Sequence, residues 1–263
     1  MTETITSRQN QFVRRAAALS DRGERARQKR FAFEGLKLFG EAVSCSAPLG
    51  EIYAVGDIAE AAAEKAPEGC RVFRVTPEVY DRLSQDRSPD GIYCVCGFLD
   101  GIHTFGRYGP DGGGRKFICA SVRDPGNIGT IVRSARAFGV DQLVLSADCA
   151  DIYNIKTVRA AMGALFAVRI HVADDITAAI EALGAAGYEV CAAVLNERAE
   201  KLGSPARNGR RVYAVGNEGH GLPDEIIRLC PSSVYIPMEA GSESLNAAIA
   251  ASVLMWEEYR GSV

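Results

Sequence analysis

The chain has 263 residues, of which 47% are hydrophobic and 24% are charged, and its formal net charge is −3. These values are typical of a soluble globular protein with one large domain or two ordinary ones. No apolar run approaches the roughly 18 residues of a membrane span, and the polar N-terminus lacks the apolar core of a signal peptide. The sequence therefore predicts a cytoplasmic protein with no membrane segment.

Helical and strand patterns alternate in the first 100 residues. Helices are predicted over Asn10–Leu19, Lys37–Val43, Ala59–Lys65 and Pro77–Leu83, and strands over Ile52–Val55, Val72–Val75 and Ile92–Phe98. We expect residues 1–100 to form a small α/β domain. Residues 101–115 contain six glycines and a proline and show no helical periodicity, which predicts a flexible linker.

The alternation is clearer in residues 116–263. Strands are predicted over Phe117–Val122, Gln142–Leu145, Ala167–Val172, Glu189–Ala193, Val212–Val215 and Val234–Ile236. Helices are predicted over Asn127–Phe138, Ile155–Met162, Ile176–Ala185, Pro223–Arg228 and Leu245–Tyr259. Repeated strand–helix units indicate a mainly parallel sheet that binds ligands at the carboxyl ends of its strands.

Basic residues are concentrated near the N-terminus. Residues 1–40 hold nine Lys and Arg against four Asp and Glu, so the rest of the chain is acidic. A basic arm on an acidic protein can attract phosphate backbones. It can equally be an ordinary solvated helix face, and charge alone leaves both interpretations open.

Eight cysteines are scattered through the chain without a C-x-x-C pair. They are Cys45, Cys70, Cys94, Cys96, Cys119, Cys149, Cys191 and Cys230. We expect buried, reduced thiols, and neither a zinc site nor disulfides.

A polar turn follows the first predicted strand after the linker. It reads Arg123-Asp-Pro-Gly-Asn127, and Asn127 is a good helix N-cap. Arg133 lies six residues further on, roughly 9 Å along the helix axis. Since helical side chains lean toward the N-terminus, a long Arg there can reach back to a site at the helix mouth. The alternative is a solvated Arg behind a plain capping residue.

Two polar loops lie near the C-terminus, each after a strand and before a helix. The first, Val215 to Leu222, contains G-x-x-G-x-G, which differs from the dinucleotide-binding G-x-G-x-x-G pattern. Its glycines permit close approach of the backbone to a ligand, and we assign no role to His220. The second loop runs from Ile236 to Asn246. We expect the two loops to form two walls of one ligand pocket.

The last helix begins beside Ser244, which by itself is a plausible N-cap. Ile249, Val253 and Trp256 then form an apolar stripe among alanines. The pattern leaves two interpretations open, a core helix or a subunit interface.

The order of these motifs is specific. Asp124-Pro-x-Asn127 with Arg133, then Gly216-Asn-Glu218-Gly-x-Gly-Leu222, then Ile236-Pro-Met with Ser244-Leu-Asn246, resembles the three motifs of the SpoU/TrmH-type RNA 2′-O-ribose methyltransferases of the SPOUT class. Residues 159–164, RAAMGA, resemble the segment between the first two motifs of that family. Residues 5–10 and 33–35 resemble the substrate-binding domain of its ribosomal-RNA branch.

The resemblance implies a small N-terminal α/β (L30e-like) domain that binds RNA substrate, and a C-terminal α/β domain whose backbone forms a trefoil knot. Composition and periodicity would not predict the knot, because true knots are rare. The implied methyl donor is S-adenosylmethionine, contacted by Gly216, Ile236 and Leu245 largely through backbone groups. The implied assembly is a homodimer with the active site near its interface.

The implied reaction is attack of a ribose 2′-hydroxyl on the donor's methyl group, without a metal. The family's motif Arg, here Arg133, has been assigned as the base, but a guanidinium is effectively always protonated. We hypothesise that Arg133 grips the adjacent phosphate and stabilises developing negative charge. The side chains that would orient Arg133 and the ribose are Asn127, Glu218, Ser244 and Asn246.

The N-terminal domain would supply phosphate contacts, which position RNA without reading its sequence. The candidates are Arg14, Arg15, Arg25 and Arg27. Ribosomal RNA is the favoured substrate and tRNA the main competitor. Two other classes remain as alternatives, a non-catalytic RNA-binding protein and a nucleotide-dependent oxidoreductase, for which the glycine pattern is wrong.

Overall fold

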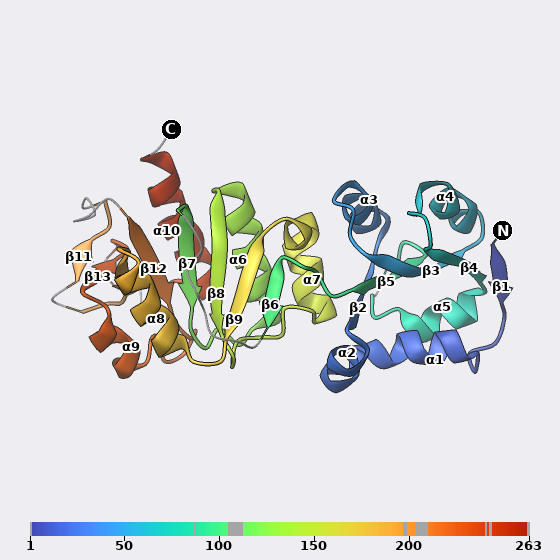
Figure 1. The fold of residues 1–263 in the computed structure, drawn as a ribbon, viewed down its shortest axis with the longest axis horizontal. Coiled ribbons are helices and arrows are strands. Elements are labelled where there is room, and N and C mark those ends of the chain that lie inside the picture. Colours follow the sequence, from blue (N-terminus) through green and yellow to red (C-terminus); the bar gives the residue numbers. More distant parts are fainter. Residues whose placement is uncertain are drawn as a thin grey trace. The chain divides into compact units, whose positions relative to one another are not determined.

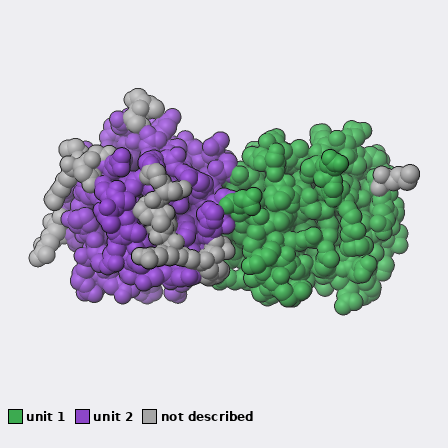
Figure 2. Space-filling model, viewed as in Figure 1, with its two compact units in different colours: residues 1–100, 151–166 green, residues 101–150, 167–263 purple. Residues whose placement is uncertain are grey.

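The computed structural model describes residues 2–86, 88–104, 113–196, 199–203, 210–239, 241 and 244–261. Its contacts divide the chain into two compact units (Figures 1 and 2). Unit 1 comprises residues 1–100 and 151–166, and unit 2 comprises residues 101–150 and 167–263. No helix within the described ranges is long and apolar enough to cross a membrane.

Unit 1 is a five-stranded mixed sheet between two pairs of helices. Its strands are β1 (Glu3–Ile5), β2 (Arg30–Glu34), β3 (Leu49–Val55), β4 (Arg71–Val75) and β5 (Ile92–Gly97), in the order β1-β4-β3-β5-β2. Its helices are α1 (Gln11–Ala17), η1 (Ala18–Ser20), α2 (Arg22–Gln28), α3 (Leu36–Ser44), α4 (Ile58–Lys65), α5 (Pro77–Leu83), α7 (Ile155–Ala161) and η2 (Met162–Phe166). Strands β1, β3 and β4 are mutually parallel, whereas β5 is antiparallel to both β2 and β3.

The core of unit 1 explains this arrangement. Apolar side chains of α1 and α5 pack with Tyr53, Phe73 and Tyr93 on one face of the sheet, and α3 and α4 lie on the other face (Figure 1). Alternation along each strand aims every second residue at α1 and α5, which buries that face.

Residues 151–166 belong to unit 1 through specific polar contacts. Arg25 is 4% exposed, and its guanidinium pairs with Asp151 at 2.5 Å and donates to the carbonyls of Leu19 and Ser20. The buried Glu34 pairs with Arg159. Because Arg25 and Glu34 are buried, their pairing with Asp151 and Arg159 makes the segment an integral part of the unit.

Unit 2 is an eight-stranded sheet in the described residues, with the order β11-β13-β10-β12-β7-β8-β9-β6. Its strands are β6 (Ile102–Thr104), β7 (Arg115–Cys119), β8 (Val140–Ser146), β9 (Arg169–Ala173), β10 (Glu189–Ala193), β11 (Glu200–Lys201), β12 (Arg211–Val215) and β13 (Ser232–Tyr235). Its helices are α6 (Pro125–Ala137), α8 (Ile176–Ala185), α9 (Asp224–Leu229) and α10 (Ala247–Arg260). All seven strand pairs are parallel, as predicted, so the carboxyl ends lie along one edge.

Helices cover both faces of this sheet (Figure 1). Residues of α8 and α9 share one core cluster with alternate residues of β7, β8, β10 and β12. The other helices, α6 and α10, pack on each other, and Ser134 and Ser252 hydrogen-bond across their contact at 2.7 Å. The predicted Ile249/Trp256 stripe is not core, because these side chains are 53% and 47% exposed.

The structure also corrects several expectations. Strands β1, β2, β6 and β11 were not predicted; β6 lies in the expected linker, whose residues 105–112 are outside the described part of the chain. The strand predicted to reach Val122 ends at Cys119, because Ser121 adopts a left-handed φ of 59°.

The burial predicted for the cysteines holds for Cys94, Cys96, Cys119, Cys149 and Cys191. It is wrong for Cys45, which is exposed because it follows the last residue of α3 at a surface turn. Cys70 and Cys230 are half-buried, and burial raises the pKa of the Cys70 thiol to about 11.

Replacing Arg25 by Ala tests the buried pair. The change leaves the largely buried Asp151 carboxylate and the carbonyl groups of Leu19 and Ser20 without their hydrogen-bond donor. We therefore expect the free energy of unfolding to fall by about 3–5 kcal/mol. Arg27→Ala is the matched control, because Arg27 lies on the same helix but is exposed and, among the residues that the structure describes, forms an ion pair with Glu24 alone. Urea unfolding measures both, and equal midpoints for the two variants would contradict the structural role.

Candidate functional site

The first wall of the site is the turn between β7 and α6. Asp124 is the N-cap of α6, since its Oδ1 accepts from the Asn127 backbone N–H at 2.8 Å, and Pro125 occupies the first turn. The prediction that Asn127 caps this helix is therefore wrong. Its carboxamide is instead free to make contacts outside the helix.

The second wall is the loop after β12, which folds back on itself. The backbones of Asn217 and Gly221 exchange two hydrogen bonds of 2.9 Å. A Cβ atom on Gly216 would lie 2.2 Å from the Gly221 carbonyl carbon and 2.3 Å from the Leu222 nitrogen. Only glycine therefore fits at position 216. The glycine pattern predicted close approach of the backbone to a ligand, whereas the approach seen at Gly216 is to the backbone of its own loop.

The third wall is the start of α10. Asn246 caps this helix, because its Oδ1 accepts from the N–H groups of Ala248 and Ile249 at 2.9 and 3.3 Å. Ser244 is exposed and lies two residues before this cap, so the alternative of Ser244 as N-cap is wrong. Ser242 and Glu243, in the same predicted loop, lie outside the described residues.

One chain of side-chain hydrogen bonds joins the three walls. Asn246 Nδ2 donates to Asn127 Oδ1 at 2.9 Å, and Asn127 Nδ2 donates to Glu218 Oε1 at 2.7 Å. Asn217 Nδ2 continues the chain to the carbonyl of Ser121 at 2.9 Å. A carboxylate only accepts and helix N–H groups only donate, so the orientations of the Asn127 and Asn246 carboxamides are fixed.

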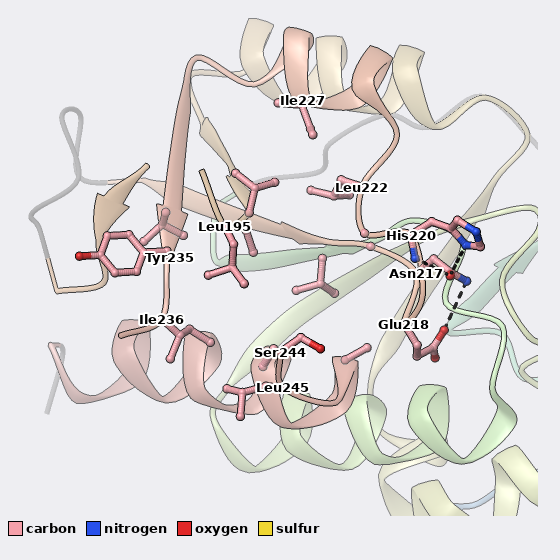
Figure 3. A pocket seen from close by; sticks show the side chains of 18 of the residues that line it. Leu195, Asn217, Glu218, His220, Leu222, Ile227, Tyr235, Ile236, Ser244 and Leu245 are labelled. Atoms are coloured by element: carbon pink, nitrogen blue, oxygen red, sulfur yellow. Dashed lines mark hydrogen bonds between the residues drawn. The ribbon is translucent and has the colours of Figure 1, made fainter. Parts of the chain in front are cut away.

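The second and third walls line a cavity of about 460 Å³ in unit 2 (Figure 3), and no residue of the first wall is among those that line it. Apolar side chains that include Leu195, Ile236 and Leu245 gather at one end, and Asn217, Glu218 and His220 lie at the other. The predicted residues that line it are Gly216, Glu218, Ile236, Ser244 and Leu245. Asn127 and Asn246 reach this wall through Glu218.

The cavity offers backbone groups as well as side chains. Within the described chain, the N–H and C=O groups of Gly216, Ile236 and Leu245 make no hydrogen bond. Unpaired backbone groups need a partner when water is excluded. A bound ligand that carries both hydrogen-bond donors and acceptors would supply these partners.

Several residues of the site carried no predicted role. Asn217 organises its loop, since its Oδ1 accepts from the N–H groups of Gly219 and His220 at 2.9 and 3.2 Å. The same oxygen lies 3.3 Å from His220 Nδ1, so that nitrogen must carry the proton of this contact. An Asn before a Glu-Gly turn was the available sequence signal. No sequence signal marked Tyr235 and Leu195 as site residues, because apolar residues at strand ends are common.

A polar cluster around the buried Ser146 supports the Ser121 turn. Ser146 donates to Asp148 at 2.6 Å and accepts from the Ser121 N–H at 2.8 Å. Burial raises the pKa of the Asp148 carboxyl, but hydrogen bonds from Ser146, Ser121 and Arg123 outweigh it, so that pKa is lowered. The charged carboxylate thereby stabilises the strained turn at neutral pH.

The remaining predicted residues are not among those that line the cavity. Arg133 is exposed on α6 and makes no hydrogen bond or ion pair with any described residue. Arg14 and Arg15 are exposed on α1, and Arg27 is exposed but paired with Glu24. Arg25 is buried against Asp151, so it supports the fold of unit 1 and offers no surface to a phosphate. No cluster of potential metal ligands occurs in the described chain.

Comparison with known proteins identifies the family. A sequence model of the SpoU rRNA Methylase family matches residues 115–256, and one of the MRM3-like substrate binding domain matches residues 10–94. The chain belongs to the SpoU rRNA methylase family. The three walls described above all lie inside the matched region.

Full-length relatives share both parts of this SpoU-family chain. It is 28% identical to the 23S rRNA (guanosine(2553)-2′-O)-methyltransferase RlmP of Bacillus subtilis (strain 168), over 96% of this chain and 97% of that protein. The AdoMet-bound rRNA methyltransferase from Sinorhizobium meliloti is 28% identical, with a TM-score of 0.86, over 100% of this chain and 99% of that one. A putative TrmH-family RNA methyltransferase from Porphyromonas gingivalis is 27% identical, with a TM-score of 0.81, over 95% and 97% of the two chains.

Gly216→Ala tests the close approach in the second wall. The added methyl group must displace backbone, so we expect the free energy of unfolding to fall by about 1–3 kcal/mol. Gly219→Ala, in the same loop, is the control, because its nearest contact would be Asn217 Oδ1 at an ordinary 3.6 Å. If both variants unfold at the wild-type denaturant concentration, the loop does not require glycine at position 216.

Proposed function

We propose that this chain transfers a methyl group from S-adenosylmethionine to a ribose 2′-hydroxyl of RNA, and that its substrate is ribosomal RNA. The observation that carries the proposal is that two of the motif loops line one cavity and that hydrogen bonds through Asn127 join the third motif to both of them. Likeness over the full length to an AdoMet-bound rRNA methyltransferase supports the donor.

The cavity fits this donor by size and chemistry. Its volume of about 460 Å³ lies within the range of roughly 300–1,000 Å³ of small-molecule sites. The unpaired backbone groups of Gly216, Ile236 and Leu245 can bind a purine edge and the donor's polar groups, while apolar neighbours cover its ring. The Glu218 carboxylate on the cavity wall suits a donor that carries a sulfonium charge.

The chain's own residues must orient the ribose and stabilise its oxygen. Bound S-adenosylmethionine would supply an electrophilic methyl group and leave as the neutral thioether when its methyl–sulfur bond breaks, and the proton of the attacking 2′-hydroxyl would pass to water. Asn127, Glu218 and Asn246 are held rigidly in one chain, so Glu218 can orient a sugar hydroxyl at the cavity mouth. Ser244 is exposed beside this mouth as a further hydroxyl partner.

Arg133 completes the proposed site as a phosphate ligand. Its guanidinium is exposed and unpaired among the described residues, so it retains all its donors for an anion. A guanidinium beside the reacting nucleotide lowers the free energy of developing negative charge. It need not act as a base, which its pKa disfavours.

The substrate proposal rests on unit 1. The match to a substrate-binding domain over residues 10–94 and the exposed Arg14 and Arg15 of α1 support RNA contacts there. The rRNA specificity in the name of the Bacillus relative favours ribosomal RNA over tRNA. An rRNA substrate also agrees with the cytoplasmic location expected from the sequence.

We also propose a homodimer and a trefoil knot in unit 2. The exposed Ile249 and Trp256 lie seven residues apart on one side of α10 and leave an apolar surface for a second copy. This helix packs on α6, which carries Arg133, so a dimer seam along α10 would lie close to the proposed site. Insertion of β12 between β10 and β7 fits the threading that a knot requires.

Arg133→Ala tests the chemistry. We expect the rate of methyl transfer to ribosomal RNA to fall by about 100-fold or more, as when a group that stabilises an oxyanion is removed. Donor affinity, measured by calorimetry, should not change, because Arg133 does not line the cavity. Arg136→Ala is the control, one turn further along the exposed part of α6. Full activity of the Arg133 variant would reject the assignment.

Ile249→Glu tests the dimer. A carboxylate on the apolar surface of α10 would lose its hydration at a seam, so sedimentation velocity should show monomers. Leu229→Glu, at a partly exposed position of α9, should leave the dimer intact. A wild-type chain that sediments as a monomer at all concentrations would contradict the proposal.

A further inference from the structure

Unit 1 contains a buried carboxylate that holds three arginines. The Glu51 side chain is 4% exposed, and its Oε1 lies 2.8 Å from Arg15, 3.0 Å from Arg30 and 3.8 Å from Arg71. The other oxygen accepts from the Tyr53 hydroxyl at 2.8 Å. We call Arg15, Arg30 and Arg71 the arginine triad.

The sheet register explains how the triad assembles. Arg71 of β4 lies directly opposite Glu51 of β3 in the parallel ladder. Arg30 comes from β2, two residues before the buried Ala32, and Arg15 from α1, which covers this face. Three separate elements therefore aim guanidinium groups at one oxygen atom.

The charges of this cluster do not balance. Three guanidinium groups share one carboxylate, which leaves an excess of two positive charges. Burial, and then the negative charge of Glu51, raise the pKa of Tyr53, so its phenol stays protonated and adds no negative charge. Among described residues, the triad makes no other ion pair.

The unused donors face solvent. The side chains of Arg15, Arg30 and Arg71 are 47%, 33% and 48% exposed. Each guanidinium carries five N–H donors, and Glu51 occupies only part of them. By contrast, Arg27 and Arg74 are each paired with a carboxylate of their own, Glu24 and Glu60. The triad is thus a preorganised cluster of donors with excess charge.

An aromatic ring lies beside the triad. The Arg71 guanidinium lies 4.1 Å from the centre of the Phe12 ring, which stacks on Phe73. Unpaired RNA bases stack on arginine guanidinium groups and on aromatic rings, and this cluster presents both. The combination of anion donors and a stacking plane favours RNA over an acidic protein surface.

We propose that the arginine triad binds a backbone phosphate of an RNA strand, with the adjacent unpaired base on Arg71. This inference rests on the proposed function and assigns its RNA contact to particular residues. Glu51 acts as a positioning residue: its buried charge holds the arginines together against their mutual repulsion. A phosphate then meets donors that are already oriented.

The test is filter binding of unmodified large-subunit ribosomal RNA to the full chain across a salt series. For Arg15→Gln with Arg71→Gln, we expect affinity at low salt to fall about tenfold and the slope of log K against log salt to shrink by about 0.7–1.4, for one or two lost phosphate contacts. Arg15→Lys alone retains the charge and should keep the wild-type slope.

Arg74→Gln is the matched control, because it removes the same charge from β4 at a similarly exposed position, 44% against 48%. Circular dichroism melting of each variant separates loss of fold from loss of contact; if the double variant melts early, Arg30→Gln takes its place. The inference is overturned if a folded triad variant keeps the wild-type slope of log K against log salt. It is also overturned if Arg74→Gln loses as much RNA affinity as the triad variant does.

Two further outcomes separate the inference from the proposed function. If wild type methylates ribosomal RNA but triad variants bind it normally, the triad inference fails and the function stands. If wild type neither binds this RNA nor transfers a methyl group to it, both fail. Loss of binding to an acidic protein alone, with RNA binding intact, would assign the triad to a protein partner and overturn the RNA assignment.

Discussion

The site of unit 2 depends on one carboxamide, that of Asn127. It accepts from Asn246 and donates to Glu218, so it joins the helix that follows β7, the loop that follows β12 and the last helix of the chain. Its position in the first turn of α6 is fixed by the Asp124 cap. Without this link, the three segments would lie near one another only because parallel strands end at the same edge.

Neutral amides suit this position better than charges. The chain Asn246–Asn127–Glu218 contains one formal charge, that of the Glu218 carboxylate. Because a carboxylate can only accept hydrogen bonds, the Asn127 carboxamide must turn its NH₂ group toward Glu218 and its oxygen toward Asn246. An exposed ion pair would contribute little and lose geometry to competing water. Directed amide hydrogen bonds therefore hold the Glu218 carboxylate in one orientation at the cavity wall.

Much of this architecture could be predicted from local sequence. Apolar sequence patterns located the strands of the unit 2 core, such as β10, because they reflect interactions between near neighbours. Glycine spacing predicted a close approach of the backbone to a ligand, but the structure shows Gly216 close to the backbone of its own loop. What could not be predicted depends on distant partners. Arg25 belongs to a basic stretch by composition, yet it is buried because Asp151, far along the chain, pairs with it. Similarly, Asn127 is a good cap by type, but Asp124 takes that role and releases Asn127 for Glu218.

Dependence on distant partners also explains why counting charges along the sequence does not predict the arginine triad. Arg30 and Arg71 are far apart in sequence, and the residue that unites them is an acid, Glu51, which lowers the apparent positive charge of the domain. A carboxylate shared by three guanidinium groups increases local positive potential by gathering them, although it subtracts one charge from the total. Burial of that carboxylate against the Tyr53 hydroxyl keeps it from competing for the same outer donors as an incoming phosphate. Net charge is therefore a poor guide to anion binding here, and the geometry around one buried acid is a better one.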